Sequence, residues 1–82
     1  MSSPEKILSL LSTVTETDEV LQNPDLALYD LQILDSMRTV ELLLAVSRDL
    51  GIEISPADFD RDAWATPRKF VDDILSRSAG VH

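Results

Sequence analysis

The sequence predicts an all-α fold, a small four-helix bundle with three main helices and one short one. Apolar residues recur at helical spacing in three segments, and a helix-start signal precedes each segment. Three of the signals are a hydroxyl residue followed by proline, at Ser3-Pro4, Ser55-Pro56 and Thr66-Pro67; the fourth is Asp35-Ser36. In each proline pair the hydroxyl residue can cap the helix, and proline can take the first helical position.

The first helix is predicted from Pro4 to about Thr15, and the following connection spans roughly residues 16–34. The core face of the helix consists of Ile7, Leu8, Leu11 and Val14. The apolar residues of the connection are Leu26, Leu28, Tyr29, Leu31, Ile33 and Leu34. Because this loop is so apolar, it is expected to pack over the helices, with a short helical turn near Val20. The carboxylates at its start are expected to be ordinary loop charges; they are Glu16, Asp18 and Glu19.

The second helix is predicted from about Ser36 to Leu50, with Gly51 as the left-handed residue that ends it. A short third helix is expected near Pro56–Asp60, and a last helix from Pro67 to about Ser76. The apolar face of the last helix consists of Phe70, Val71, Ile74 and Leu75. We expect Asp72 and Asp73 to lie on its solvated face. Residues 1–82 are expected to form one small domain, ordered over about 4–77, with a flexible tail at 78–82.

Charge and composition exclude several classes of function. The chain has 15 acidic and 7 basic residues, a net charge of −8, so phosphate backbones and anionic membrane surfaces would repel it. Partners with basic patches would instead be attracted to it. The chain contains no cysteine, and no metal site is expected. Met1 leads almost directly into an amphipathic helix with no export signal, so we expect a cytoplasmic monomer without membrane insertion.

The second predicted helix carries two apolar stripes, one more than a core requires. Its core stripe consists of Thr39, Leu42, Leu43, Val46 and Leu50. The second stripe consists of Met37, Val40 and Leu44, bordered by Asp35, Glu41 and Arg48. Either the long loop covers this stripe, or it stays exposed as a docking surface for partner proteins. An apolar centre with a charged rim is typical of transient interfaces, and methionine suits a surface that fits several partners.

Ser36 opens this helix, and Asp35 is the natural cap before it. A serine at a helix start is usually a cap or a neutral surface residue. No histidine lies near it in sequence, since His82 is the only one in the chain, so a Ser-His-acid triad is not expected. If Ser36 has a chemical role, another enzyme must modify it. A phosphate ester would suit this position, because helix N-termini favour negative charge.

These segments resemble the acyl carrier proteins. The resemblance rests on Asp35-Ser36-Met37, on Thr39-Val40-Glu41-Leu42 after it, and on Gly51-Ile52-Glu53-Ile54. It extends from the first helix to Leu75 and implies a four-helix bundle whose second helix opens with a DSL-type motif. It implies that a phosphopantetheinyl transferase attaches a 4′-phosphopantetheine arm to Ser36. The arm brings its own thiol, so the absence of cysteine is no obstacle.

A second resemblance is narrower. The stretch from Phe59 to Pro67, which reads FDRDAWATP, is similar to a segment of the D-alanyl carrier proteins, as are Asn23-Pro24-Asp25 and the leucines at 42–44. This subgroup implies that an adenylating enzyme loads an aminoacyl group as a thioester, and that an acyltransferase or an assembly-line acceptor receives it. Teichoic acid D-alanylation is the primary interpretation. An aminoacyl or β-aminoacyl carrier in a polyketide or nonribosomal peptide pathway is the alternative.

Two further expectations remain open at this stage. Trp64 is expected to pack between the third and last helices beside Phe59, rather than to recognise the arm or a partner. A function of another class also fits the residues, an unmodified acidic adaptor that docks through Met37, Val40 and Leu44. A small independent enzyme is a third and weaker interpretation, because a chain of 82 residues leaves little interior space for a catalytic pocket.

Overall fold

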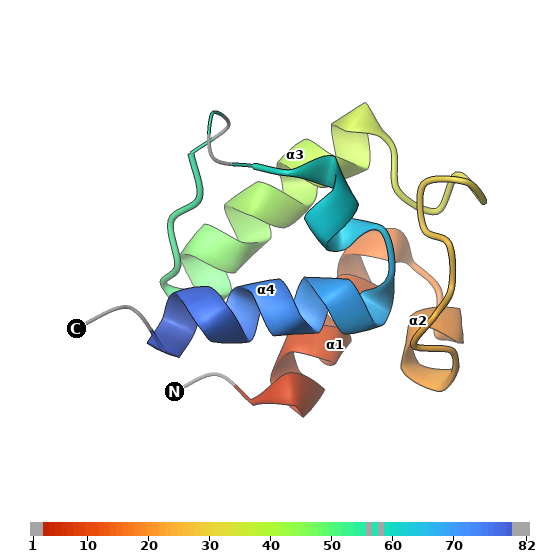
Figure 1. The fold of residues 1–82 in the computed structure, drawn as a ribbon, viewed down its shortest axis with the longest axis horizontal. Coiled ribbons are helices and arrows are strands. Elements are labelled where there is room, and N and C mark those ends of the chain that lie inside the picture. The colour runs from red at the N-terminus through yellow and green to blue at the C-terminus, as the bar shows by residue number, and fades with distance from the viewer. Residues whose placement is uncertain (1–2, 56, 58, 80–82) are drawn as a thin grey trace.

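The computed structural model describes residues 3–55, 57 and 59–79. Within these residues the fold is all-helical, which confirms the predicted small bundle (Figure 1). The α-helices are α1 (Pro4–Thr15), α2 (Glu19–Gln22), α3 (Ser36–Ala45) and α4 (Pro67–Ala79). Two shorter turns are η1 (Val46–Leu50), which is π-helical, and η2 (Arg61–Trp64), which is a 3₁₀ turn. No helix in the described part of the chain is long and apolar enough to cross a membrane.

The first helix has the predicted bounds. Ser3 caps it, because its Oγ accepts a hydrogen bond from the backbone N–H of Lys6 at 3.2 Å, and Pro4 occupies the first turn. The helix ends at Thr15, and the next residue, Glu16, has a left-handed backbone with φ 59°. Ile7 and Leu11 are fully buried, whereas Leu8 and Val14 are partly buried against the same core.

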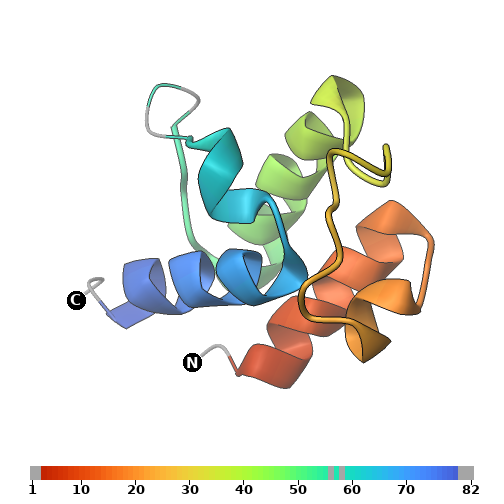
Figure 2. The ribbon, with the colours of Figure 1, turned by 45° about the vertical axis from the view of Figure 1, so that its right-hand side comes forward.

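The connection between α1 and α3 packs onto the bundle, as its apolar content predicts. It forms the short helix α2 with Val20 buried, and its buried leucines are Leu26, Leu28 and Leu34. The backbone N–H of Leu28 donates to the carbonyl of Ala65 at 2.9 Å, and that of Arg68 donates to the carbonyl of Pro24 at 3.0 Å. This segment is therefore bonded to the junction of η2 and α4 before it reaches the start of α3 (Figure 2).

The second predicted helix has two parts in the structure. Its α-helical part, α3, ends at Ala45, and η1 continues it with wider π-helical turns to Leu50. Gly51 has φ 68° and ends the element, in agreement with the prediction. Only glycine adopts this backbone conformation without steric cost from a Cβ atom.

The predicted third helix near Pro56–Asp60 is wrong in position. Pro56 and Asp58 lie outside the described residues, while Phe59 and Asp60 are not helical and the turn forms at Arg61–Trp64. Asp60 starts the turn, because its Oδ1 accepts from the backbone N–H of Asp62 at 3.0 Å. The turn must end by Ala65, because a residue before proline, here Thr66, is disfavoured in the helical region.

The last helix is longer than predicted, since α4 extends to Ala79 instead of Ser76. Thr66 caps it as expected, accepting from the backbone N–H of Lys69 at 3.2 Å. Asp73 is not on a solvated face, which corrects the expectation for it, whereas Asp72 is exposed. The Asp73 carboxylate accepts from Trp64 Nε1 at 2.9 Å and from Arg77 Nε at 3.0 Å. The pair with Arg77, four residues on, supports the additional turn. Residues 80–82 of the predicted tail lie outside the described residues.

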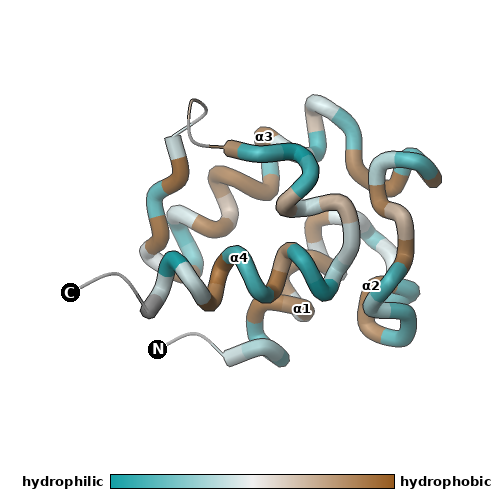
Figure 3. Tube along the Cα trace, in the orientation of Figure 1, coloured by the Kyte–Doolittle hydropathy of each residue, from teal (hydrophilic) through white to brown (hydrophobic). Residues whose placement is uncertain are grey.

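The core lies between α1, α3 and α4, where hydrophobic residues recur at helical intervals (Figure 3). Its largest fully buried side chain is Trp64, followed by Phe70. Helix α1 contacts α2, α3 and α4, while α4 also contacts η2. Along α3 the side chains of Met37, Val40 and Leu44 stay exposed, and the candidate site lies along this stripe and on either side of it.

Candidate functional site

Ser36 is the first residue of α3, and its side chain is exposed. Asp35 caps the helix as predicted, because its Oδ1 accepts from the backbone N–H of Arg38 at 2.8 Å. The capping position is therefore filled by a carboxylate, and the Ser36 hydroxyl is not needed for it. The N-terminus of α3 favours a negatively charged group on this hydroxyl.

The second apolar stripe of α3 is exposed. Met37 is 74% accessible, Val40 55% and Leu44 65%. The long loop does not cover these residues, because its buried leucines pack toward the core instead. Of the two alternatives that the helical spacing left open, a covered stripe and an exposed one, the structure shows the exposed one.

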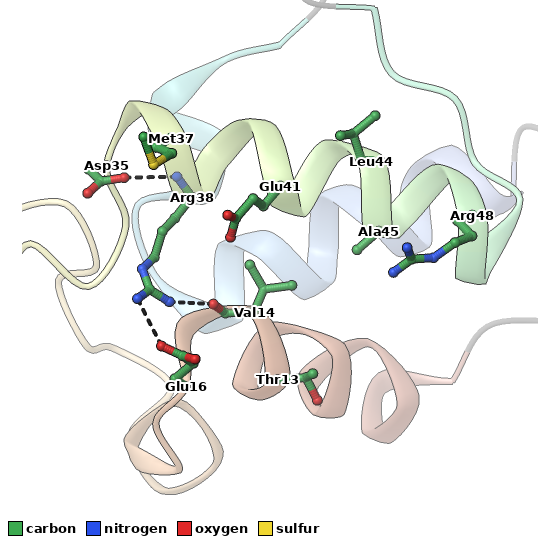
Figure 4. Close-up of a pocket in the computed structure, with 10 residues that line it drawn as sticks. All are labelled: Thr13, Val14, Glu16, Asp35, Met37, Arg38, Glu41, Leu44, Ala45 and Arg48. Atoms are coloured by element: carbon green, nitrogen blue, oxygen red, sulfur yellow. Dashed lines mark hydrogen bonds and ion pairs between the residues drawn. The ribbon is translucent and has the colours of Figure 1, made fainter.

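One groove lies between α1 and α3, and we refer to it as the α1-side groove (Figure 4). From α3 and η1 it is lined by Met37, Arg38, Glu41, Leu44, Ala45 and Arg48, and from α1 and its end by Thr13, Val14 and Glu16, with Asp35 at the helix start. Five of the six predicted docking residues thus lie at this groove. Val40 does not, because it faces the other side of α3.

Arg38 links the two walls of the α1-side groove. One guanidinium nitrogen donates to the carbonyl of Val14 at 2.6 Å, and the other donates to Glu16 at 3.0 Å (Figure 4). The Val14 carbonyl belongs to the last turn of α1, where helical partners are missing, so the arginine satisfies a group that the helix leaves open. Glu16 is consequently not an ordinary loop charge, which corrects that expectation. Arg38 fixes the start of α3 against the end of α1.

The other side of α3 borders a second hollow, the η2-side cleft, and Ser36 itself lines it. Its α3 wall contains Ser36, Thr39, Val40 and Leu43, and the facing wall contains Tyr29, Phe59 and Arg61. The Tyr29 hydroxyl shares a 2.8 Å hydrogen bond with the hydroxyl of Thr39. The Arg61 guanidinium lies over the Tyr29 ring, 4.3 Å from its centre, a cation–π geometry.

Trp64 supports the wall of this cleft from behind, in the position predicted for it. Its ring packs edge-to-face on Phe59 and on Phe70, with centroids 4.9 and 4.8 Å apart. Its indole N–H donates to Asp73, so the buried polar group is satisfied. The tryptophan is thereby a structural residue that holds Phe59 at the cleft.

Sequence reasoning missed three residues of the site: Tyr29, Arg38 and Arg61. Tyr29 was assigned only to the apolar loop, Arg61 was read only as part of the FDRDAWATP stretch, and Arg38 was given no role in the site. The partners of Arg38 and Tyr29 are 22 to 24 and 10 residues away in the sequence, and Arg61 reaches Tyr29 from a different segment. No helical or strand periodicity signals such contacts, so the chain alone gave no means of finding them.

A family model described as the phosphopantetheine attachment site matches residues 5–74, which is most of the chain. The chain belongs to this family. Domains of the family hold 4′-phosphopantetheine covalently and carry acyl groups on it, so this carrier domain is not itself catalytic. Carrier domains work with a phosphopantetheinyl transferase and with acyl-handling enzymes.

The residues at the start of α3 fit the group that the carrier domain holds. A phosphodiester needs an accessible hydroxyl, and Ser36 supplies one at a helix N-terminus whose capping bond is made by Asp35. Ser36 would hold the arm, and the arm would supply a thiol that this cysteine-free chain lacks. Among the described residues, no group of three or more metal-binding side chains is gathered at any point.

Proposed function

We propose that Ser36 is the attachment residue and that the carrier domain presents an aminoacyl thioester on the attached arm. The observation that supports this most directly is the exposed hydroxyl of Ser36 at the first position of α3, beside an exposed apolar stripe, in a member of the phosphopantetheine attachment family. A separate adenylating enzyme loads the arm, and a transferase removes the aminoacyl group. The carrier acts as a cytoplasmic monomer.

We propose that partner enzymes dock on Asp35, Met37, Val40, Glu41, Leu44 and Arg48. Met37 and Leu44 supply exposed apolar area, and Glu41 is an exposed carboxylate between them on the α1-side groove. Partners with a basic and apolar patch would complement this surface. The net charge of −8 would increase their rate of encounter.

D-alanine is the cargo we propose first, because the segment from Phe59 to Pro67 resembles that of D-alanyl carriers. The second candidate is an aminoacyl or β-aminoacyl group for a polyketide or peptide assembly line. Loading assays with a D-alanine-activating ligase and with a β-amino-acid-activating enzyme separate the two.

Intact mass spectrometry after co-expression with a broad-specificity phosphopantetheinyl transferase tests the attachment residue. We expect the wild type to gain one phosphopantetheine, Ser36→Ala to gain none, and Ser9→Ala, an exposed serine on α1, to behave as the wild type. An unmodified wild type would support the alternative that this chain is an acidic helical adaptor. Modification of Ser36→Ala would place the arm on another residue.

A further inference from the structure

The charges of the α1-side groove change sign along its length. Asp35 and Glu41 lie toward the start of α3, and Arg48 lies at the far end of the groove, in η1 (Figure 4). The Arg48 side chain runs back along the groove toward Ala45 (Figure 4). A wholly basic partner surface would be attracted to this acidic chain as a whole, but Arg48 would repel it at close range. The groove therefore complements a partner surface that carries both signs of charge.

Glu41 and Arg48 are the charged groups of this groove that a partner can engage most readily. Arg38 already donates to groups at the end of α1, and one oxygen of Asp35 caps α3. Within the described part of the chain, the exposed Glu41 carboxylate forms no ion pair. Arg48 contacts the adjacent Asp49 at 3.3 Å, and exposed pairs of this kind contribute little, so a partner carboxylate can replace Asp49.

The spacing of these two charges suits a second helix. Glu41 and Arg48 are seven residues apart, which is two helical turns and about 10 Å along the axis. Residues seven apart on a partner helix also share one face, so a helix lying in the groove can place one side chain opposite each charge. Between them, Leu44 is exposed and the small Ala45 forms the floor. An apolar side chain of the partner can therefore bury its surface over Ala45 and against Leu44.

The change of sign also sets the direction in which such a helix lies. A helix turned end for end would bring its basic residue to Arg48 and its acidic residue to Glu41, and both contacts would be repulsive. Because Ser36 lies at the acidic end of the groove, the direction of the helix determines which part of the partner comes near Ser36. A groove with acidic charges alone would not distinguish the two directions in this way.

We propose that the α1-side groove binds an amphipathic helix of the aminoacyl-loading enzyme, with a basic residue against Glu41, an apolar residue over Ala45 and an acidic residue against Arg48. This inference rests on the proposed docking surface of α3 and specifies the chemistry of its partner. The loading enzyme is the partner for which this selection matters, because it commits one amino acid to this chain. Arg48 then acts as a specificity residue, since it disfavours partners whose surface is wholly basic.

Charge reversal at Arg48 tests the proposal through the direction of its effect. The carrier bearing its arm is loaded by the D-alanine-activating ligase or the β-amino-acid-activating enzyme, whichever loads the wild type, and kcat/KM for the carrier is measured. We expect Arg48→Glu to lower kcat/KM about fivefold. Arg68→Glu changes the net charge equally at a position that does not line the groove, and should leave kcat/KM within about twofold of the wild type. An increase in Arg48→Glu, as a wholly basic partner would give, or an unchanged value would overturn the inference.

A peptide titration makes the test independent of attachment and of loading. Two alanine-rich helical peptides of about 15 residues carry lysine, leucine and glutamate, or lysine, leucine and lysine, at positions i, i+4 and i+7, and are titrated into isotope-labelled carrier without its arm. The peptide with glutamate should bind the wild type about threefold more tightly and shift the resonances of Glu41 and Arg48, and Arg48→Glu should reverse the preference. The same preference in both proteins, shifts outside the groove or no binding of either peptide would contradict the inference. An unmodified chain in the intact-mass experiment would contradict attachment alone.

Discussion

The α1-side groove and the η2-side cleft border the same helix but are held together by different forces. Across the groove, one arginine connects a helix end to a carboxylate, and both acidic and basic side chains stay in contact with water. The two walls of the cleft are joined by the hydrogen bond between Tyr29 and Thr39, and behind one wall a chain of rings runs from Phe59 through Trp64 to Phe70 in the core. The groove thus depends on an ion pair that salt weakens, and the cleft on packed rings and a neutral hydrogen bond that salt does not screen.

This difference gives the two sides of α3 different surface chemistry. A charged, half-exposed surface suits transient partners, because it attracts them and releases them. Substitutions in each region should therefore give different phenotypes.

Trp64→Ala should destabilise the packing behind the η2-side cleft. Removing the largest buried ring leaves a cavity and deprives the Asp73 carboxylate of a donor, so we expect a loss of about 3–5 kcal/mol in the free energy of unfolding. Urea unfolding followed by circular dichroism measures it. Trp64→Phe, which retains a ring, should lose less, and an equal loss in both variants would mean that the ring packing contributes little.

Arg38→Met should remove the contact across the α1-side groove and lower the free energy of unfolding by a smaller amount. The Val14 carbonyl and Glu16 lose their partner, so we expect a loss of about 1–3 kcal/mol. The wild-type advantage should shrink at high ionic strength, because part of it is an ion pair at the surface. Unfolding curves at low and high salt would contradict this account if the difference were independent of salt.

Glu41→Lys and Leu44→Asp should change partner binding while leaving the fold intact. Both side chains are exposed, so the helical circular dichroism should match that of the wild type. Each should lower kcat/KM of the phosphopantetheinyl transferase, with the carrier as substrate, about tenfold, which is equivalent to about 1.4 kcal/mol of lost interaction. Val46→Ala, at the start of η1 directly after α3, is the matched contrast, because Val46 is fully buried and its truncation should lower stability instead. Unchanged kinetics in both surface variants would remove this face from the docking surface.

Arg48→Ala should have the smallest effect on stability. Its guanidinium is mostly exposed and pairs with the neighbouring Asp49 at 3.3 Å, a contact that contributes at most about 0.5 kcal/mol. If Arg48 belongs to the docking surface, the rate at which the phosphopantetheinyl transferase modifies the carrier should nevertheless change. A large loss of stability would show that the arginine has a structural role instead.

Helix starts were predicted well, and the position of the short third helix was not. Ser3, Asp35 and Thr66 each cap a helix through a bond to a residue three positions on, and such local contacts can be read directly from the chain. The position of the η2 turn depends instead on how the rings of Trp64 and Phe59 pack against the core. Asp73 is partly buried, and its carboxylate accepts the hydrogen bond of the Trp64 indole N–H. Contacts of this kind join residues that no local pattern relates.

The sequence by itself predicted the three main helices, the caps Ser3, Asp35 and Thr66, the second apolar stripe of α3, and the family to which the chain belongs. It did so because capping and amphipathic spacing are local properties, with a repeat of about 3.6 residues per turn. Only the tertiary structure decided that Ser36 opens toward η2, that Arg38 joins α3 to α1, and that Arg61 lies over Tyr29. Those contacts arise when distant segments are brought together by burial of a shared core, and they make one side of α3 a cleft and the other a charged groove.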